Sequence, residues 1–196
     1  MKKLFRICLL TAALFTSIGF VARTASALPI LGEKLFYTGG DITVEVLSAT
    51  AGYTSDLSLY LFSPTLSVVS GAYFGTNHSV GLITTVNPED DFGYSIGDEL
   101  MFGIYVRDSG YTYLMGGAAR NPDGLIHAAV DNLGSNQYIV GFEDLYGGGD
   151  LDYDDNRFLF SGGLATSSEV PAPATLLLLV SGLAGLGFTR ARRQIQ

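Results

Sequence analysis

An acidic, glycine-rich segment between Gly141 and Asn156 carries the residues best suited to chemistry. Its six carboxylates are Glu143, Asp144, Asp150, Asp152, Asp154 and Asp155. Crowding of like charges is unfavourable unless a cation offsets it, and Ca²⁺ takes about six to eight oxygen ligands from carboxylates and carbonyls. Asp150, Asp152 and Asp154 alternate along the chain, so a curling loop can turn all three toward one centre. We therefore predict a structural Ca²⁺ site whose ligands come from these six carboxylates.

Turn chemistry is the alternative explanation for these aspartates, because Asp and Asn commonly cap turns and stay solvated in loops. We predict that role for the isolated Asp108, Asp123 and Asp131. An EF-hand is excluded, since the sixth position counted from Asp150 is not glycine and the twelfth is not glutamate.

Catalytic motifs are weaker than the acidic segment. Asp108-Ser109-Gly110 matches an aspartic protease tripeptide, but that enzyme needs two facing copies. His127 and Asp131 would suit part of a Ser-His-Asp site, yet no Gly-x-Ser-x-Gly turn accompanies them, and we expect His127 to lie on a strand. Two loop carboxylates across a cleft would suit glycoside hydrolysis. We therefore predict no enzyme, with a secreted polysaccharide hydrolase as the alternative.

Several stretches of the chain match the signature of a known domain. They are Phe142–Leu145, Gly147–Asp150, Asp152–Asp155, Gly97–Leu100 and Asn121–His127. Over roughly residues 90–160 the chain thus resembles an uncharacterised family of exported bacterial β domains. The resemblance implies an exported β domain that binds Ca²⁺, and it implies no activity.

Short runs of Val, Ile, Leu, Tyr and Phe alternate with clusters of turn-forming residues, and helical periodicity is almost absent. Strands are expected at Ile42–Leu47, Leu57–Phe62, Gly81–Val86, Leu100–Val106, Thr112–Leu114, Ile126–Val130, Tyr138–Phe142 and Arg157–Phe160. Turns are expected at Thr38–Asp41, Asn87–Asp90, Asp108–Gly110, Asn121–Gly124, Asp131–Gly134 and Gly147–Gly149. This spacing predicts an all-β, two-sheet β-sandwich that is jelly-roll-like, with the acidic segment between its last two strands.

The charge of the expected domain, residues 28–168, excludes some partners. Its eighteen acidic residues outnumber four basic ones, a formal charge of about −14. Such a surface repels nucleic acid, so we expect no nucleic-acid partner. The single cysteine, Cys8, precedes the domain, which excludes a disulfide or a cysteine metal site within it.

The N-terminal residues 1–27 have the pattern of a secretory signal peptide. Lys2, Lys3 and Arg6 precede an apolar run, and Ala25-Ser26-Ala27 follows it. Basic, apolar and small-residue regions in this order are typical of such signals. We predict cleavage after Ala27, with Ala25 and Ala27 as the cleavage-site residues.

The C-terminal end has the pattern of a stop-transfer signal. A linker at residues 169–175 leads to a transmembrane segment at 176–189 and a basic cytoplasmic tail at 190–196. The segment is near the lower length limit for crossing a bilayer, and the arginines favour the cytoplasmic side.

This three-part order resembles the PEP-CTERM sorting signal of Gram-negative bacteria. The matching residues are Val170, Pro171, Pro173, Arg190, Arg192 and Arg193. The family's usual glutamate between the two prolines is replaced by Ala172. The resemblance implies recognition and removal of the tail by exosortase, a membrane protease-transpeptidase.

Together these patterns predict an exported protein that is anchored in the cell-envelope membrane by its C-terminal helix. If the tail is processed, the protein becomes a cell-surface or extracellular protein. We expect a structural or binding role in the extracellular matrix, with polysaccharide as a partner. A calcium-bridged carbohydrate-binding module is a further alternative.

Overall fold

The computed structural model describes residues 28–62 and 65–166. The predicted signal peptide, linker, transmembrane segment and basic tail lie outside these residues. Within them, no helix is long and apolar enough to cross a membrane. The elements are β1 (Ile30–Leu31), β2 (Leu35–Ala49), β3 (Ser55–Phe62), β4 (Leu66–Thr76), β5 (Ile83–Val86), α1 (Pro88–Phe92), β6 (Phe102–Val106), β7 (Thr112–Leu114), η1 (Ala118–Arg120), β8 (Ala128–Gly134), β9 (Gln137–Phe142) and β10 (Asn156–Thr166).

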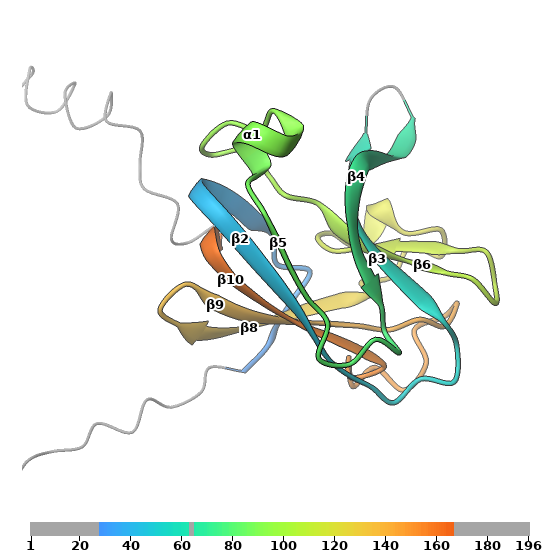
Figure 1. Cartoon of the computed structure of the whole chain (residues 1–196). Coiled ribbons are helices and arrows are strands. Elements are labelled where there is room, and N and C mark those ends of the chain that lie inside the picture. The colour runs from blue at the N-terminus through green and yellow to red at the C-terminus, as the bar shows by residue number, and fades with distance from the viewer. Residues whose placement is uncertain (1–27, 63–64, 167–196) are drawn as a thin grey trace, which may run out of the picture.

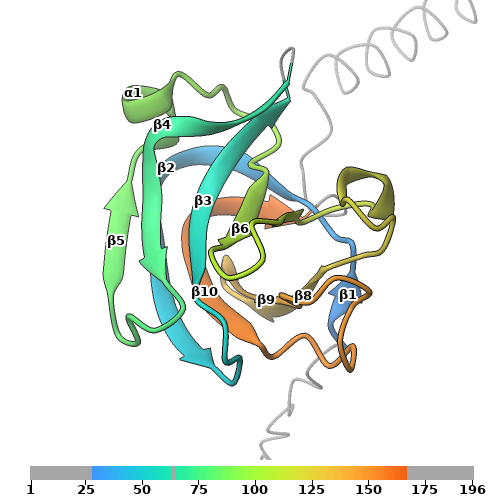
Figure 2. The same ribbon diagram turned by 90° about the vertical axis from the view of Figure 1, so that its right-hand side faces the viewer.

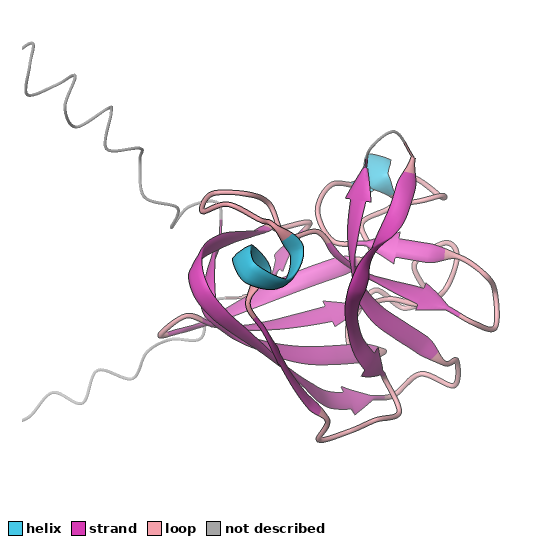
Figure 3. Ribbon diagram, turned by 45° about the horizontal axis from the view of Figure 1, so that its top comes forward, coloured by secondary structure: helices cyan, strands magenta, loops and turns pink. Residues whose placement is uncertain are grey.

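The strands form two antiparallel sheets that face each other (Figures 1 and 2). One sheet has the order β1-β8-β9-β10-β2-β5, and the other has the order β4-β3-β6-β7. The predicted all-β, two-sheet sandwich is confirmed. Figure 3 shows how little of the described chain is helical.

Apolar side chains between the sheets form the core. In β2, Ile42, Val44 and Val46 are fully buried, while the residues between them face outward, as the period of two along a strand requires. Phe102 of β6 contacts Phe160 of β10 at a ring-centroid distance of 4.5 Å. This contact joins the two sheets directly, and burial of such rings is the main stabilising contribution to a disulfide-free domain.

Each of the eight predicted strands overlaps an observed strand, but β1 and β4 were missed. Gly71, Gly75 and two serines interrupt the apolar pattern of β4, and glycine is depleted in strands. The backbone of β4 is held in the strand conformation by its pairing with β3, which its own sequence does not indicate.

Two predicted turns were wrong. Thr38–Asp41 lies inside β2, where Gly39 and Gly40 have positive φ angles, and the register with β10 shifts beside them. Asp131–Gly134 is the end of β8, and the chain turns instead at Ser135 and Asn136, both at positive φ. Turn-forming residues therefore also occur at irregularities within a strand.

The predicted turn at Asn87–Asp90 is the start of α1. The Asn87 side chain accepts hydrogen bonds from the backbone N–H groups of Glu89 and Asp90, which is the usual N-cap arrangement. Gly93 ends the helix in the left-handed conformation.

Candidate functional site

The acidic segment connects two neighbouring strands. β9 ends at Phe142 and β10 begins at Asn156, and these two residues are paired in the sheet. Residues 143–155 thus leave the sheet and return to it at the same level. This topology brings carboxylates from both ends of the segment near one another, and it agrees with the predicted position between the last two strands.

Glu143 is the residue around which the segment closes. Its side chain is fully buried, although a carboxylate is costly to bury without partners. Oε1 accepts a hydrogen bond from the backbone N–H of Tyr153 at 2.6 Å, whereas Oε2 is buried without any hydrogen-bond partner. Burial raises the pKa of Glu143 to about 7, and the charges of nearby aspartates contribute.

Glu143, Asp150 and Asp152 form the acidic cluster of this site. Each offers a carboxylate oxygen within 4.8 Å of the others. Asp150 and Asp152 are exposed, so the cluster has a buried floor and an open outer side. Among the described residues, no basic side chain forms an ion pair with these three carboxylates, and such a group of acceptors could hold a metal ion.

Gly149 fits closely over the buried member of this cluster. It has a positive φ of 56°, and a Cβ atom at this position would lie 2.7 Å from Oε2 of Glu143. Glycine therefore allows both the left-handed turn and the close approach of the backbone.

The other three predicted ligands are placed differently. Asp154 accepts a hydrogen bond from the Thr50 hydroxyl at 2.7 Å, and Asp155 accepts one from the backbone N–H of Asp144. Asp144 is buried, and burial together with the charge of Asp155 raises its pKa to about 6. The expected convergence of Asp150, Asp152 and Asp154 is therefore observed only in part. Asp150 and Asp152 converge, and the third carboxylate of the group is that of Glu143.

His127 and Asp123 lie in the loop before β8 and anchor the segment from there. The backbone carbonyl of His127 accepts a hydrogen bond from the N–H of Glu143 at 2.9 Å. The imidazole Nδ1 of His127 lies 3.0 Å from the carbonyl oxygen of Glu143. The Nε2 atom lies 2.8 Å from Asp123 Oδ2, which also accepts the N–H of Gly147. The imidazole stacks on the Tyr113 ring at 3.8 Å. Both backbone polar groups of Glu143 are thus held by one buried residue.

These placements correct two predictions. Asp123 caps a turn through the N–H of Leu125, but its side chain is only 3% exposed and so is not solvated. His127 lies just before β8 and bonds Asp123, not Asp131. In the sequence, Asp123 and His127 are related only by a spacing of four residues within a predicted turn. No periodic pattern marks them, so their interaction could not be predicted.

A substitution at Gly141 tests how closely the acidic segment packs against the sheet. A Cβ atom there would lie 2.0 Å from the carbonyl oxygen of Tyr153. We expect Gly141→Ala to displace the segment and to lower the free energy of unfolding by about 2 kcal/mol, measured by urea denaturation. Gly52→Ala is the matched control, because a Cβ there meets nothing within 4 Å. Equal stabilities of the two variants would contradict the described packing.

Comparison with protein-family models, curated proteins and solved structures finds no match to this chain. The two family resemblances therefore remain predictions.

Proposed function

We propose that this chain is an exported cell-surface or extracellular-matrix protein whose β-sandwich is stabilised by a Ca²⁺ ion in the acidic cluster. Two observations carry the proposal. Oε2 of Glu143 is buried without a hydrogen-bond partner, and a carboxylate oxygen of Glu143 lies within 4.8 Å of those of Asp150 and Asp152. A buried acceptor without a partner is rare in native proteins, and a bound cation would supply the missing partner.

The chemistry of the donor set supports a hard cation. All three ligands are carboxylates, and oxygen donors suit Ca²⁺ and Mg²⁺ more than zinc or copper. Ca²⁺ tolerates irregular geometry and mixed carboxylate, carbonyl and water ligands. Because two members of the cluster lie on a glycine-rich loop, such tolerance favours Ca²⁺.

The structural role follows from where the ligands lie. Glu143 directly follows β9, while Asp150 and Asp152 belong to the excursion that precedes β10. A cation shared by the three would tie the excursion to the end of β9. It would also offset their mutual repulsion.

The alternative of a polysaccharide hydrolase is less well supported by this geometry. A glycosidase pair stands about 5 Å or more apart across a cleft that admits the sugar. The carboxylate oxygens here lie within 4.8 Å of one another around one point. This convergence favours an ion over a substrate bond.

The proposed export and membrane sorting are supported by the sequence patterns at the two ends of the chain. The signal-peptide pattern ending at Ala27 and the tail pattern from Val170 to Arg193 support secretion, membrane anchoring and recognition by an exosortase-type protease. Cell fractionation, with and without the three tail arginines, would test this part.

Thermal unfolding tests the ion. An ion that binds only the folded state must raise the melting temperature. We expect millimolar Ca²⁺ to raise Tm relative to chelator, and the rise to be lost in an Asp150→Ala, Asp152→Ala double variant. Asp90→Ala is the control, since Asp90 is exposed and lies far along the chain in α1. No shift in the unmodified protein would refute the metal site.

A further inference from the structure

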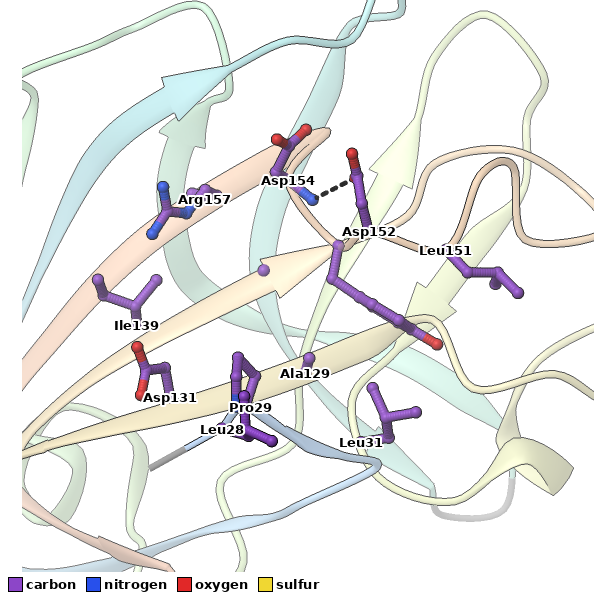
Figure 4. A pocket seen from close by; sticks show the side chains of 12 residues that line it. Leu28, Pro29, Leu31, Ala129, Asp131, Ile139, Leu151, Asp152, Asp154 and Arg157 are labelled. Carbon is purple, nitrogen blue, oxygen red and sulfur yellow. Dashed lines mark hydrogen bonds between the residues drawn. The ribbon is translucent and has the colours of Figure 1, made fainter. Parts of the chain in front are cut away.

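A hollow of about 420 Å³ lies on the outer face of the larger sheet, beside the acidic cluster. Its volume falls within the usual range for small-ligand sites, about 300–1,000 Å³. Figure 4 shows Arg157, Ile139 and Asp131 along one side, with Leu151 on the other. Asp152 belongs both to the lining of this hollow and to the acidic cluster.

Small residues on the central strands form the floor. Ala129 of β8 is paired with Gly141 of β9, and Gly141 is paired with Arg157 of β10. Their side chains therefore share the outward face of one row across the sheet. Ala129 has a small side chain, and the outward side of Gly141 is covered by the carbonyl group of Tyr153. The hollow therefore lies over Ala129, between Arg157 and β1.

Two charged groups in the hollow lack partners of their own. Among the described residues, no hydrogen bond or ion pair engages the Arg157 guanidinium. Asp131 Oδ1 is buried and has no hydrogen-bond partner. The pairing of Asp131 with Ile139 places it one row from Gly141 and Arg157. The Arg157 guanidinium thus leaves hydrogen-bonding capacity for a ligand in this hollow. Because Oδ1 of Asp131 is excluded from solvent, Asp131 can accept from a ligand only through Oδ2.

A tyrosine held in an unusual backbone conformation completes the wall. Tyr153 lines the hollow and has a positive φ of 58°, as does Leu151 at 62°. Such conformations cost about 1–3 kcal/mol for residues other than glycine and are concentrated at functional sites. The Tyr153 hydroxyl donates to the carbonyl of Ile126, so the ring is fixed in place beside the cavity.

We propose that this hollow binds a hexuronate residue of an acidic polysaccharide. The guanidinium of Arg157 pairs with the sugar carboxylate, since its planar fork matches a carboxylate bidentately. Asp131 accepts hydrogen bonds from sugar hydroxyl groups. The ring lies over Ala129 against Tyr153, whose aromatic ring suits the apolar face of a sugar.

The inference deepens the proposed function and rests on it in one respect. Asp131, Asp152 and Asp154 all line the hollow, and their charges oppose an anionic ligand. A Ca²⁺ ion in the acidic cluster offsets the charge of Asp152. We therefore expect uronate binding to require Ca²⁺.

Calorimetric titration of the full-length chain in mild detergent tests the proposal, with tetragalacturonate as the probe. With Ca²⁺ present, we expect saturable binding of tetragalacturonate. The fully methyl-esterified tetrasaccharide should not bind, because esterification removes the carboxylate charge that pairs with Arg157. Arg157→Gln should weaken binding at least tenfold. Arg107→Gln is the matched control, since Arg107 pairs with Asp56 on the other sheet.

The outcomes separate the two proposals. A Ca²⁺-induced rise in Tm without tetragalacturonate binding would refute the uronate site and leave the ion site standing. Equal binding of the acid and its ester, or equal losses in the two arginine variants, would also refute it. No rise in Tm with Ca²⁺ would refute the ion site itself. An Ala129→Leu variant that binds normally would show that the ligand lies elsewhere.

Discussion

In calcium-free buffer, the free energy of unfolding should fall as the pH rises from about 5 to about 8. Burial raises the pKa of Glu143 to about 7 and that of Asp144 to about 6. A carboxyl group whose pKa is raised by folding stabilises the folded state only while it is protonated. Its contribution is complete below the ordinary pKa and is lost as the pH rises through the raised value. One pKa unit is worth about 1.4 kcal/mol, so ionisation of Glu143 should cost roughly 3 kcal/mol.

Ca²⁺ should reverse this dependence. The ion binds the ionised carboxylates, so protons compete with it, and the stabilisation by Ca²⁺ should grow from pH 5 to pH 8. Urea unfolding at several pH values, with and without Ca²⁺, measures both profiles. A calcium-free profile that is flat or rises with pH would show that Glu143 is not a strained, buried carboxyl group.

Glu143→Gln should have opposite effects in the two buffers. The amide keeps the oxygen that accepts the Tyr153 N–H and removes the buried charge. In calcium-free buffer at pH 8, we expect this variant to be more stable than the unmodified protein by roughly 3 kcal/mol. With millimolar Ca²⁺ it should be the less stable of the two, since it has lost a charged ligand.

Glu45→Gln is the matched control, because Glu45 lies on β2 outside the acidic cluster and alternates with buried Val44 and Val46. Its effect should be small in both buffers. If Glu143→Gln were destabilising with and without Ca²⁺, Glu143 would act through packing or hydrogen bonds and not as a ligand.

Local patterns in the sequence predicted most of the sheets. Val44 and Val46 alternate with polar residues, and such alternation requires a strand with one buried face. β4 carries no such signal because Gly71 and Gly75 interrupt it. Its strand conformation depends on pairing with β3, and pairing partners cannot be read from a single run of residues.

The candidate site was predicted in part for a similar reason. Six carboxylates beside three glycines indicate a cation site, and the structure brings Glu143, Asp150 and Asp152 together. The sequence could not show that Thr50 would bind Asp154, since these residues are far apart in the chain. Nor could it show that His127 would hold the backbone of Glu143. The spacing of carboxylates along the chain predicts a cation site, but contacts between residues far apart in the sequence determine which carboxylates form it.

A Ca²⁺ binding isotherm of the full-length chain, obtained by equilibrium dialysis at pH 8, addresses the ion site itself. We predict one saturable ion per chain in the unmodified protein and none in the Asp150→Ala, Asp152→Ala double variant. Binding in the Asp90→Ala control should be unchanged. Failure of the unmodified protein to bind, or full binding by the double variant, would contradict a Ca²⁺ site at Glu143, Asp150 and Asp152.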